Sequence, residues 1–214
     1  MEELEYRVLT ACANTLFPLR LIRKDPADGF AVSDIISVVC RLFEDGDVFA
    51  TSASGLIDCL TDDGVEDVSR LSMFVPAMAD IEFSIVAGNP ELYFGMNSKA
   101  ATRWEAFAQP DWDRYINDAV YRYDEVHKNF EQNMWSRTRS RLEEAIRFHY
   151  SGEAVPGTEL WSHVSPWRAT YWKTLPSGHH VKLRVRDQRI APVTDGETKW
   201  SRTLGWHRSP SECH

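Results

Sequence analysis

Four side chains between positions 124 and 131 have the types and the spacing of a metal site. Asp124, Glu125, His127 and Glu131 recur at intervals that place them on one side of a helix. Carboxylate and imidazole groups together bind divalent cations. A metal centre also needs a third or fourth ligand, and no Glu-x-x-His motif occurs in the chain. We therefore favour a solvated helix face with local salt bridges, and predict no metal site and no cofactor.

The adjacent pair His179 and His180 suggests a base or a metal ligand within a hairpin. Neighbouring residues of a strand point to opposite faces, so at most one of the two serves a given site. A polar pair flanking a turn is the interpretation that we favour. His163, His207 and His214 are scattered and form no spaced zinc pattern.

Motifs for nucleophilic catalysis and phosphate binding are missing from the sequence. Ser52-Ala53-Ser54-Gly55 lacks the first glycine of Gly-x-Ser-x-Gly, and neither a phosphate loop nor Gly-x-Gly-x-x-Gly occurs. The paired carboxylates Asp62/Asp63 and Asp111/Asp113 lie in short polar stretches typical of turns. We therefore predict no catalytic residue from the sequence.

Tryptophans and basic residues are interleaved near the end of the chain. Five of the eight tryptophans fall in the last quarter: Trp161, Trp167, Trp172, Trp200 and Trp206. A candidate ligand platform consists of Trp172, Lys182, Arg184 and Arg186. Such a platform suits single-stranded nucleic acid, but large rings also fill small β-cores. We favour the core over the platform and keep both interpretations.

The net charge of −8 is unevenly distributed along the chain. Residues 1–117 have a net charge of −11 and residues 118–214 one of +3. The predicted partner-binding residues are six acidic side chains of the first part: Asp62, Asp63, Glu66, Asp67, Asp80 and Glu82. Such a surface repels phosphate backbones and attracts basic partners.

Widely spaced cysteines and the lack of a long apolar run bear on the compartment. Cys12, Cys40 and Cys59 lie among apolar residues, as buried thiols do. No stretch of about 18 uncharged apolar residues occurs, and the first residues are acidic. We predict a cytoplasmic location and no membrane partner.

Apolar spacing predicts an α+β protein. Helices are expected over residues 3–16, from Ser33 as the cap to Gly46, from Pro76 to Gly88, and over 100–107. In the third of these, Met78, Ile81 and Ile85 are expected on one face, and Asp80, Glu82 and Ser84 on the other. Strands are expected over 47–53 and 92–96. Residues 118–152 are predicted to form one long linking helix or two nearly continuous ones. A small, antiparallel, β-rich region follows over 153–214, with strands over 170–174 and 181–186 around a turn at Pro176 to Gly178. Apolar and basic residues alternate along the second of these strands, which predicts one apolar and one basic face. The first region, residues 1–117, is the acidic one.

The order of elements over residues 30–107 resembles a winged-helix domain. In that family a strand after the third helix has an aromatic-x-Leu-Thr-x-x-Gly pattern, and Phe94, Met96, Asn97 and Ala100 stand at those places. The resemblance implies DNA binding through the third helix and the wing. No lysine or arginine occurs between Arg70 and Lys99, however, so the charges favour a protein-binding variant of the fold.

Three functions follow from these observations. We expect foremost a non-enzymatic protein-binding protein whose acidic surface engages a basic partner, such as a toxin-neutralising immunity protein or antitoxin-type inhibitor. The alternative is a nucleic-acid-associated regulator that uses the basic, tryptophan-rich C-terminal region. The third is an enzyme whose site assembles from residues far apart in the sequence.

Overall fold

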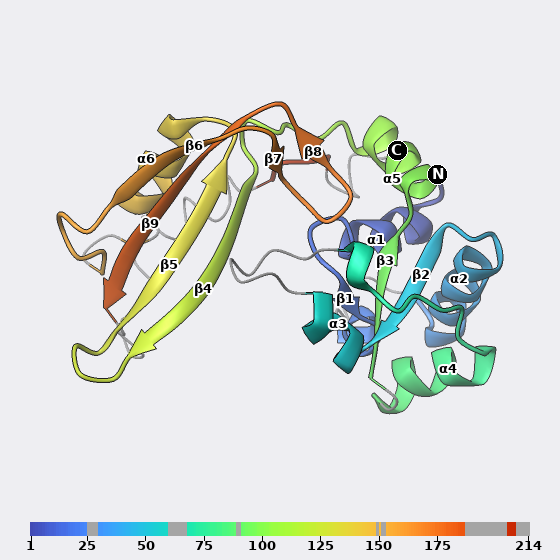
Figure 1. Cartoon of the computed structure of the whole chain (residues 1–214). Helices are drawn as coiled ribbons and strands as arrows, with labels where there is room; N and C mark the ends of the chain where they lie inside the picture. Colours follow the sequence, from blue (N-terminus) through green and yellow to red (C-terminus); the bar gives the residue numbers. More distant parts are fainter. Residues whose placement is uncertain are drawn as a thin grey trace. The chain divides into compact units, whose positions relative to one another are not determined.

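A computed structural model describes residues 1–24, 30–59, 68–88, 91–148, 150, 153–186 and 205–208 (Figure 1). The chain divides into two compact units. Of the described residues, unit 1 contains those of 1–109 and 170–172 together with Arg208, and unit 2 contains those of 110–169 and 173–207. The class is α+β, as predicted, and no helix in the described ranges is long and apolar enough to cross a membrane.

Unit 1 combines helices with a three-stranded antiparallel sheet of order β1-β3-β2. Its strands are β1 (Phe17–Pro18), β2 (Val48–Ser52) and β3 (Leu92–Met96). Its α-helices are α1 (Glu3–Ala11), α2 (Val32–Glu44), α3 (Ala53–Cys59), α4 (Met78–Ala87) and α5 (Ser98–Ala108). The described residues of unit 1 also form the 3-10 helices η1 (Leu19–Lys24) and η3 (Val68–Arg70). Helix α2 packs against both β2 and α4 (Figure 1).

The predicted C-terminal ends of α2 and α4 are confirmed, whereas the first helix ends at Ala11 and not at residue 16. Gly46 and Gly88 follow α2 and α4 with positive φ angles of 66° and 75°, a conformation that glycine adopts without steric strain. The Asn97 side chain caps α5 by accepting a hydrogen bond from the Ala100 amide at 2.9 Å. The cap of α2 was predicted wrongly, because Ala31 occupies that position and the Ser33 carbonyl accepts a hydrogen bond from Ser37 instead.

The core of unit 1 includes a segment from much later in the chain. The Tyr171 hydroxyl donates to the Cys12 carbonyl at 2.8 Å and accepts from the Met96 amide at 2.7 Å. The Trp172 indole donates to the Ala13 carbonyl at 2.7 Å and packs edge-on against Trp104. These contacts bring residues 170–172 into unit 1, and a strand over 170–174 was therefore the wrong prediction. Only Thr174 and Leu175 form a strand, β8.

Unit 2 is built on a four-stranded antiparallel sheet of order β4-β5-β9-β6. Its strands are β4 (Ile116–Asp124), β5 (Asn129–Ser136), β9 (Gly178–Arg186) and β6 (Leu160–Val164). The short strands β7 (Trp167–Arg168) and β8 pair with each other, and helix α6 spans Arg139–Phe148.

The predicted long helix over 118–152 is wrong, since this segment folds as the β4–β5 hairpin followed by α6. Its apolar residues recur at intervals that fit a helix, but Val126, one of them, lies in the hairpin turn and is 84% exposed. Aromatic and β-branched residues of β4 favour a strand. Lys128 ends the turn with a φ of 50°, a conformation that no helix contains.

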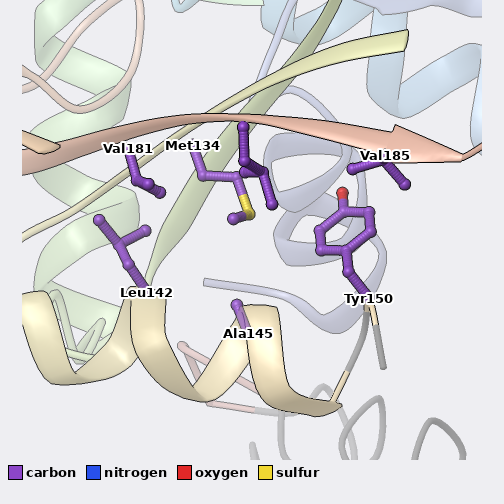
Figure 2. Close-up of a cluster of buried hydrophobic side chains, with 7 residues drawn as sticks. Met134, Leu142, Ala145, Tyr150, Val181 and Val185 are labelled. Atoms are coloured by element: carbon purple, nitrogen blue, oxygen red, sulfur yellow. The ribbon is translucent and has the colours of Figure 1, made fainter. Parts of the chain in front are cut away.

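Helix α6 covers one face of this sheet through a cluster of buried apolar side chains. Figure 2 shows Leu142 and Ala145 of α6 pointing toward Met134 of β5 and Val181 of β9. Alternate residues of β9 are buried, which confirms the predicted separation of an apolar face from a basic one: Val181, Leu183 and Val185 are inside, and Lys182, Arg184 and Arg186 lie on the opposite face.

Candidate functional site

Several carboxylates on α1 and in the turn after α2 are paired with the chain's own basic groups. Asp47 is 1% exposed and forms ion pairs with Lys99 Nζ and Arg103 Nη1, both at 3.0 Å. The angles of these two contacts do not allow hydrogen bonds, so the interaction is purely ionic. Glu5 pairs with Arg103 at 2.7 Å and with Arg41 at 3.5 Å. The charges of Asp47 and Glu5 are neutralised within the protein and are therefore not available to a partner.

The predicted acidic residues fall into two groups. Asp62, Asp63, Glu66 and Asp67 lie outside the described residues. Asp80 and Glu82 lie on α4 and are exposed. Within the described part of the chain, neither of these two carboxylates forms an ion pair. Asp80 and Glu82 therefore present charge outward, unlike Asp47 and Glu5.

The outward side of α4 is apolar. Ile81, Ser84 and Ile85 are buried, so the helix faces unit 1 with these three residues. On the opposite side Ala79, Phe83, Val86 and Ala87 follow the i, i+4, i+7, i+8 spacing of a single stripe. Phe83 is 58% exposed and Val86 53% exposed. At 3.6 residues per turn, Glu82 borders this stripe on one side and Asp80 on the other.

The sequence assigned the faces of α4 only in part. Met78 was expected beside Ile81 and Ile85 on the inner face, yet it is 57% exposed, whereas Ser84 was expected outside and is buried. The exposed apolar surface continues along the chain into the segment before the helix, where Met73, Phe74 and Val75 are 54%, 42% and 65% exposed. We call Met73–Val75 together with the outer stripe of α4 and its two carboxylates the α4 face.

Phe74 ties the α4 face to the sheet. Its backbone amide and carbonyl form hydrogen bonds with the carbonyl and amide of Ala50 in β2, at 3.0 and 3.1 Å. This antiparallel bridge fixes the backbone of the segment while its side chain remains 42% exposed. An exposed apolar side chain on an anchored backbone is preorganised for binding, because less ordering entropy is lost on contact.

The pKa of the buried Cys40 thiol reflects the negative charge near α4. Burial raises the pKa of the Cys40 thiol above its ordinary value, and the nearby carboxylates Glu44 and Glu82 raise it further. Glu44 ends α2 and is exposed, and no basic group among the described residues pairs with it. The acidic region therefore extends from α4 to the end of α2.

A cavity of about 460 Å³ lies elsewhere in unit 1 and is lined by Met1, Glu5, Arg103, Ala106 and Phe107. Its two charged groups, Glu5 and Arg103, neutralise each other at 2.7 Å. The cavity therefore offers a ligand little unbalanced charge.

The predicted nucleic-acid platform divides between the units. Trp172 belongs to unit 1, whereas Lys182, Arg184 and Arg186 line one face of β9 in unit 2. Lys182 pairs with Glu131 of β5 at 2.6 Å, and Arg184 and Arg186 are exposed. Other tryptophans pack with rings: Trp167 is 2% exposed, and Trp206 lies against Trp112 and Tyr115.

Of the residues spaced as metal ligands, Asp124, Glu125 and His127 lie at the turn of the β4–β5 hairpin, and Glu131 lies in β5. Asp124 accepts hydrogen bonds from the amides of Val126 and His127, and its carboxylate lies 2.7 Å from His127 Nδ1. The His127 amide is the main cause that lowers the pKa of Asp124 below its ordinary value. The described residues contain no group of three potential ligands that could hold a metal ion.

A hydrogen-bonded histidine on the other face of the unit 2 sheet was missed by sequence reasoning. His180 Nδ1 lies 3.1 Å from Ser162 Oγ, and His180 Nε2 lies 2.9 Å from Asn133 Oδ1. The imidazole stacks on Trp135, with ring centroids 4.8 Å apart and planes at 18°. The expected separation of the two histidines is confirmed, because His179 instead packs edge-on against His163.

Pairing among three strands creates this cluster. Ser162 of β6 lies opposite His180 of β9, and His180 lies opposite Trp135 of β5. The positions are up to 47 residues apart, so only the strand register brings them together. The one available signal was the His179-His180 pair in an alternating strand.

Compared with known proteins, the chain matches no protein-family model, no curated protein and no solved structure.

Proposed function

We propose that the protein is a non-enzymatic binding protein whose α4 face docks a basic partner protein. An immunity protein or antitoxin-type inhibitor that occupies a cationic surface is the concrete form of this proposal. A cytoplasmic location belongs to it, supported by the free, buried thiols Cys12 and Cys40. The winged-helix resemblance of unit 1 is likewise part of the proposal.

The observation that carries the proposal is an exposed apolar stripe between two outward carboxylates. Exposed apolar surface rimmed by polar residues is typical of protein interaction sites. Phe83 and Val86 supply such surface on α4, and Asp80 and Glu82 supply the rim. Charges at a rim mainly set the rate of encounter and the choice of partner, whereas apolar anchors supply affinity.

The partner's chemistry follows from this arrangement. A helix with an apolar stripe bordered by lysine or arginine on both sides would match the α4 face, because its stripe would contact the apolar stripe and its basic residues would contact Asp80 and Glu82. Helix-in-groove and helix-on-helix recognition uses apolar anchors spaced by three and four residues.

A designed peptide can test this recognition. The probe is a fluorescein-labelled amphipathic helix with leucines on one stripe and lysines at its borders, and the Kd is measured by anisotropy at low and high salt. We expect binding that weakens with salt. The variant Asp80→Lys/Glu82→Lys should lower affinity at least about tenfold, which corresponds to about 1.4 kcal/mol.

Two controls make the result specific. Asp34→Lys/Glu125→Lys gives the same change of net charge at exposed sites on other elements than α4 and should leave the Kd within about twofold. A peptide with glutamates in place of lysines should not bind. If the wild type fails to bind, or both double variants weaken binding equally, the proposal is wrong.

The exposed Arg184 and Arg186 support the alternative, a nucleic-acid-associated regulator. A labelled single-stranded oligonucleotide should then bind with a steep dependence on salt concentration, and replacing Lys182, Arg184 and Arg186 by alanine should abolish binding. Binding that survives these substitutions would exclude the β9 row as the contact.

A further inference from the structure

We propose that Ser162, His180 and Asn133 form a nucleophilic site that accepts acyl groups from activated esters or thioesters. This activity is separate from docking at the α4 face, and confirming it would overturn only the non-enzymatic part of the function proposed above. Ser162 is the nucleophile, His180 the base and Asn133 a positioning residue.

The hydrogen bonds define which nitrogen of His180 acts as the base. Asn133 Oδ1 can only accept, so His180 Nε2–H donates to it, and the lone pair of Nδ1 is directed at Ser162 Oγ. Asn133 is 7% exposed, so its amide has little access to water as an alternative partner. A base that is oriented by a third group and hydrogen-bonded to a hydroxyl is the arrangement of an activated nucleophile.

The sheet makes this arrangement rigid. Register pairing between β6, β9 and β5 sets the positions of Ser162, His180 and Trp135 in one row. Stacking on Trp135, which is 9% exposed, holds the imidazole plane. Sites built on strands keep their geometry better than sites on loops.

Access distinguishes this network from an ordinary buried one. Ser162 is exposed, and β6 is the edge of the sheet in the described part of the chain. An edge strand leaves alternate backbone amides unpaired, and such amides are the donors that stabilise an oxyanion. The open edge suits a small or extended acyl donor, which needs no deep pocket.

The reaction is an ordinary acyl transfer. Ser162 Oγ attacks the acyl carbon while its proton moves to His180 Nδ1, and the bond between Oγ and carbon forms as the bond between carbon and the leaving group breaks. The proton then passes from His180 to the leaving alkoxide or thiolate. Water, activated by the same imidazole, subsequently hydrolyses the acyl-serine to the carboxylic acid and restores Ser162.

The full-length protein can be tested with two probes. Incubation with a fluorophosphonate followed by peptide mass spectrometry should place the label on Ser162, and p-nitrophenyl acetate should release p-nitrophenolate in a burst of one equivalent per protein. Ser162→Ala should abolish both signals. Ser140→Ala is the matched control, because Ser140 is an exposed serine of unit 2 bonded to Thr138 rather than to a histidine, and it should react as the wild type does.

Variants of the base and of the positioning residue separate catalysis from structure. His180→Gln should lower the labelling rate by at least about 100-fold, within the usual contribution of a general base. Asn133→Asp should raise the rate several-fold, because a carboxylate stabilises the imidazolium better than an amide does. Circular dichroism of each variant verifies folding.

The pH profile supplies an independent readout. The wild-type labelling rate should rise between about pH 5 and 8, where histidine loses its proton, and this rise should disappear in His180→Gln. A wild type that is not labelled at Ser162, or a folded His180→Gln that reacts at the wild-type rate, would overturn the proposal.

Discussion

Both units pack their helices through buried apolar side chains, such as Leu9 and Trp104 in unit 1, but they differ in the ion pairs that link separate elements. In unit 1, helices α1 and α5 and the turn after α2 are joined by ion pairs, through Glu5, Arg103 and buried Asp47. In unit 2, α6 is held on the sheet by an apolar cluster that includes Leu142 and Val181. The ion pair of Arg139 with Glu143 lies at the surface of α6, whereas Arg141, which pairs with Glu144 at 2.6 Å, is buried.

This difference shows that the net charge of a sequence segment does not reveal how much charge a partner can reach. Unit 1 contains most of the acidic residues, and its internal pairs consume much of that charge. Part of the accessible charge lies on α4, where Asp80 and Glu82 border apolar surface. A prediction of charge-driven binding therefore has to distinguish carboxylates that are paired within the protein from those that are exposed and unpaired.

The largest expected effect tests the apolar half of this comparison. Leu142→Ala removes a fully buried side chain of α6 and should destabilise unit 2 by about 2–5 kcal/mol. Urea unfolding followed by hydrogen-exchange mass spectrometry of peptides from α6 and β9 measures it. Phe148→Ala, on the same helix but 37% exposed, is the control, and an equal loss in both variants would contradict the buried cluster.

The second prediction compares two aspartates of unit 1. Asp47→Asn removes a buried charge whose ion-pair partners, Lys99 and Arg103, are half-exposed. It should lower the free energy of unfolding by about 2 kcal/mol, between the values for buried and exposed ion pairs. Asp80→Asn should change stability by less than about 0.5 kcal/mol. Urea midpoints at pH 7 measure both, and similar midpoints for the two variants would remove the distinction between internal and outward charge.

The third prediction concerns alkaline pH. Burial raises the pKa of the Cys12 thiol from 9.0 to about 12. Between these values the unfolded thiol has lost its proton and the folded one has kept it, so stability falls as pH rises. At pH 10 the loss from this group is about 1.4 kcal/mol. Cys12→Ala should show a pH dependence weaker by that amount in urea titrations from pH 7 to 10.

The smallest effect should come from the surface of unit 2. Glu143→Gln removes an exposed i, i+4 ion pair with Arg139 and should cost about 0.2–0.5 kcal/mol, decreasing in high salt. Thermal unfolding at low and high salt measures it. A loss of stability above about 1 kcal/mol would mean that this ion pair stabilises α6 as strongly as the ion pairs of Asp47 stabilise unit 1.

Local patterns predicted part of the fold well. The bounds of β3, the end of α4 at Gly88 and the alternation along β9 follow from spacing and from glycine chemistry within a few residues. The β4–β5 hairpin was missed because its apolar residues also fit a helical spacing. Tertiary pairing of β5 with β9 decides between the two structures, and local spacing does not contain that information.

The two candidate sites also differ in how much of each could be predicted from the sequence. Asp80 and Glu82 were identified because charge is visible in the sequence, although the apolar stripe between them was not. Ser162, His180 and Asn133 come from three strands, and their proximity depends on two strand registers. A single sequence does not specify these registers over such separations.

The contribution of Tyr171 to the core of unit 1 has a consequence for synthesis of the protein. Residues 1–109 leave the ribosome first, yet the hydrogen bonds of Tyr171 with Cys12 and Met96 cannot form before residue 171 is made. At 5–20 residues per second, translation of that interval takes about 3–12 s. A nascent chain would wait through this interval with an incomplete core, and a fragment that ends at Gln109 would never complete it.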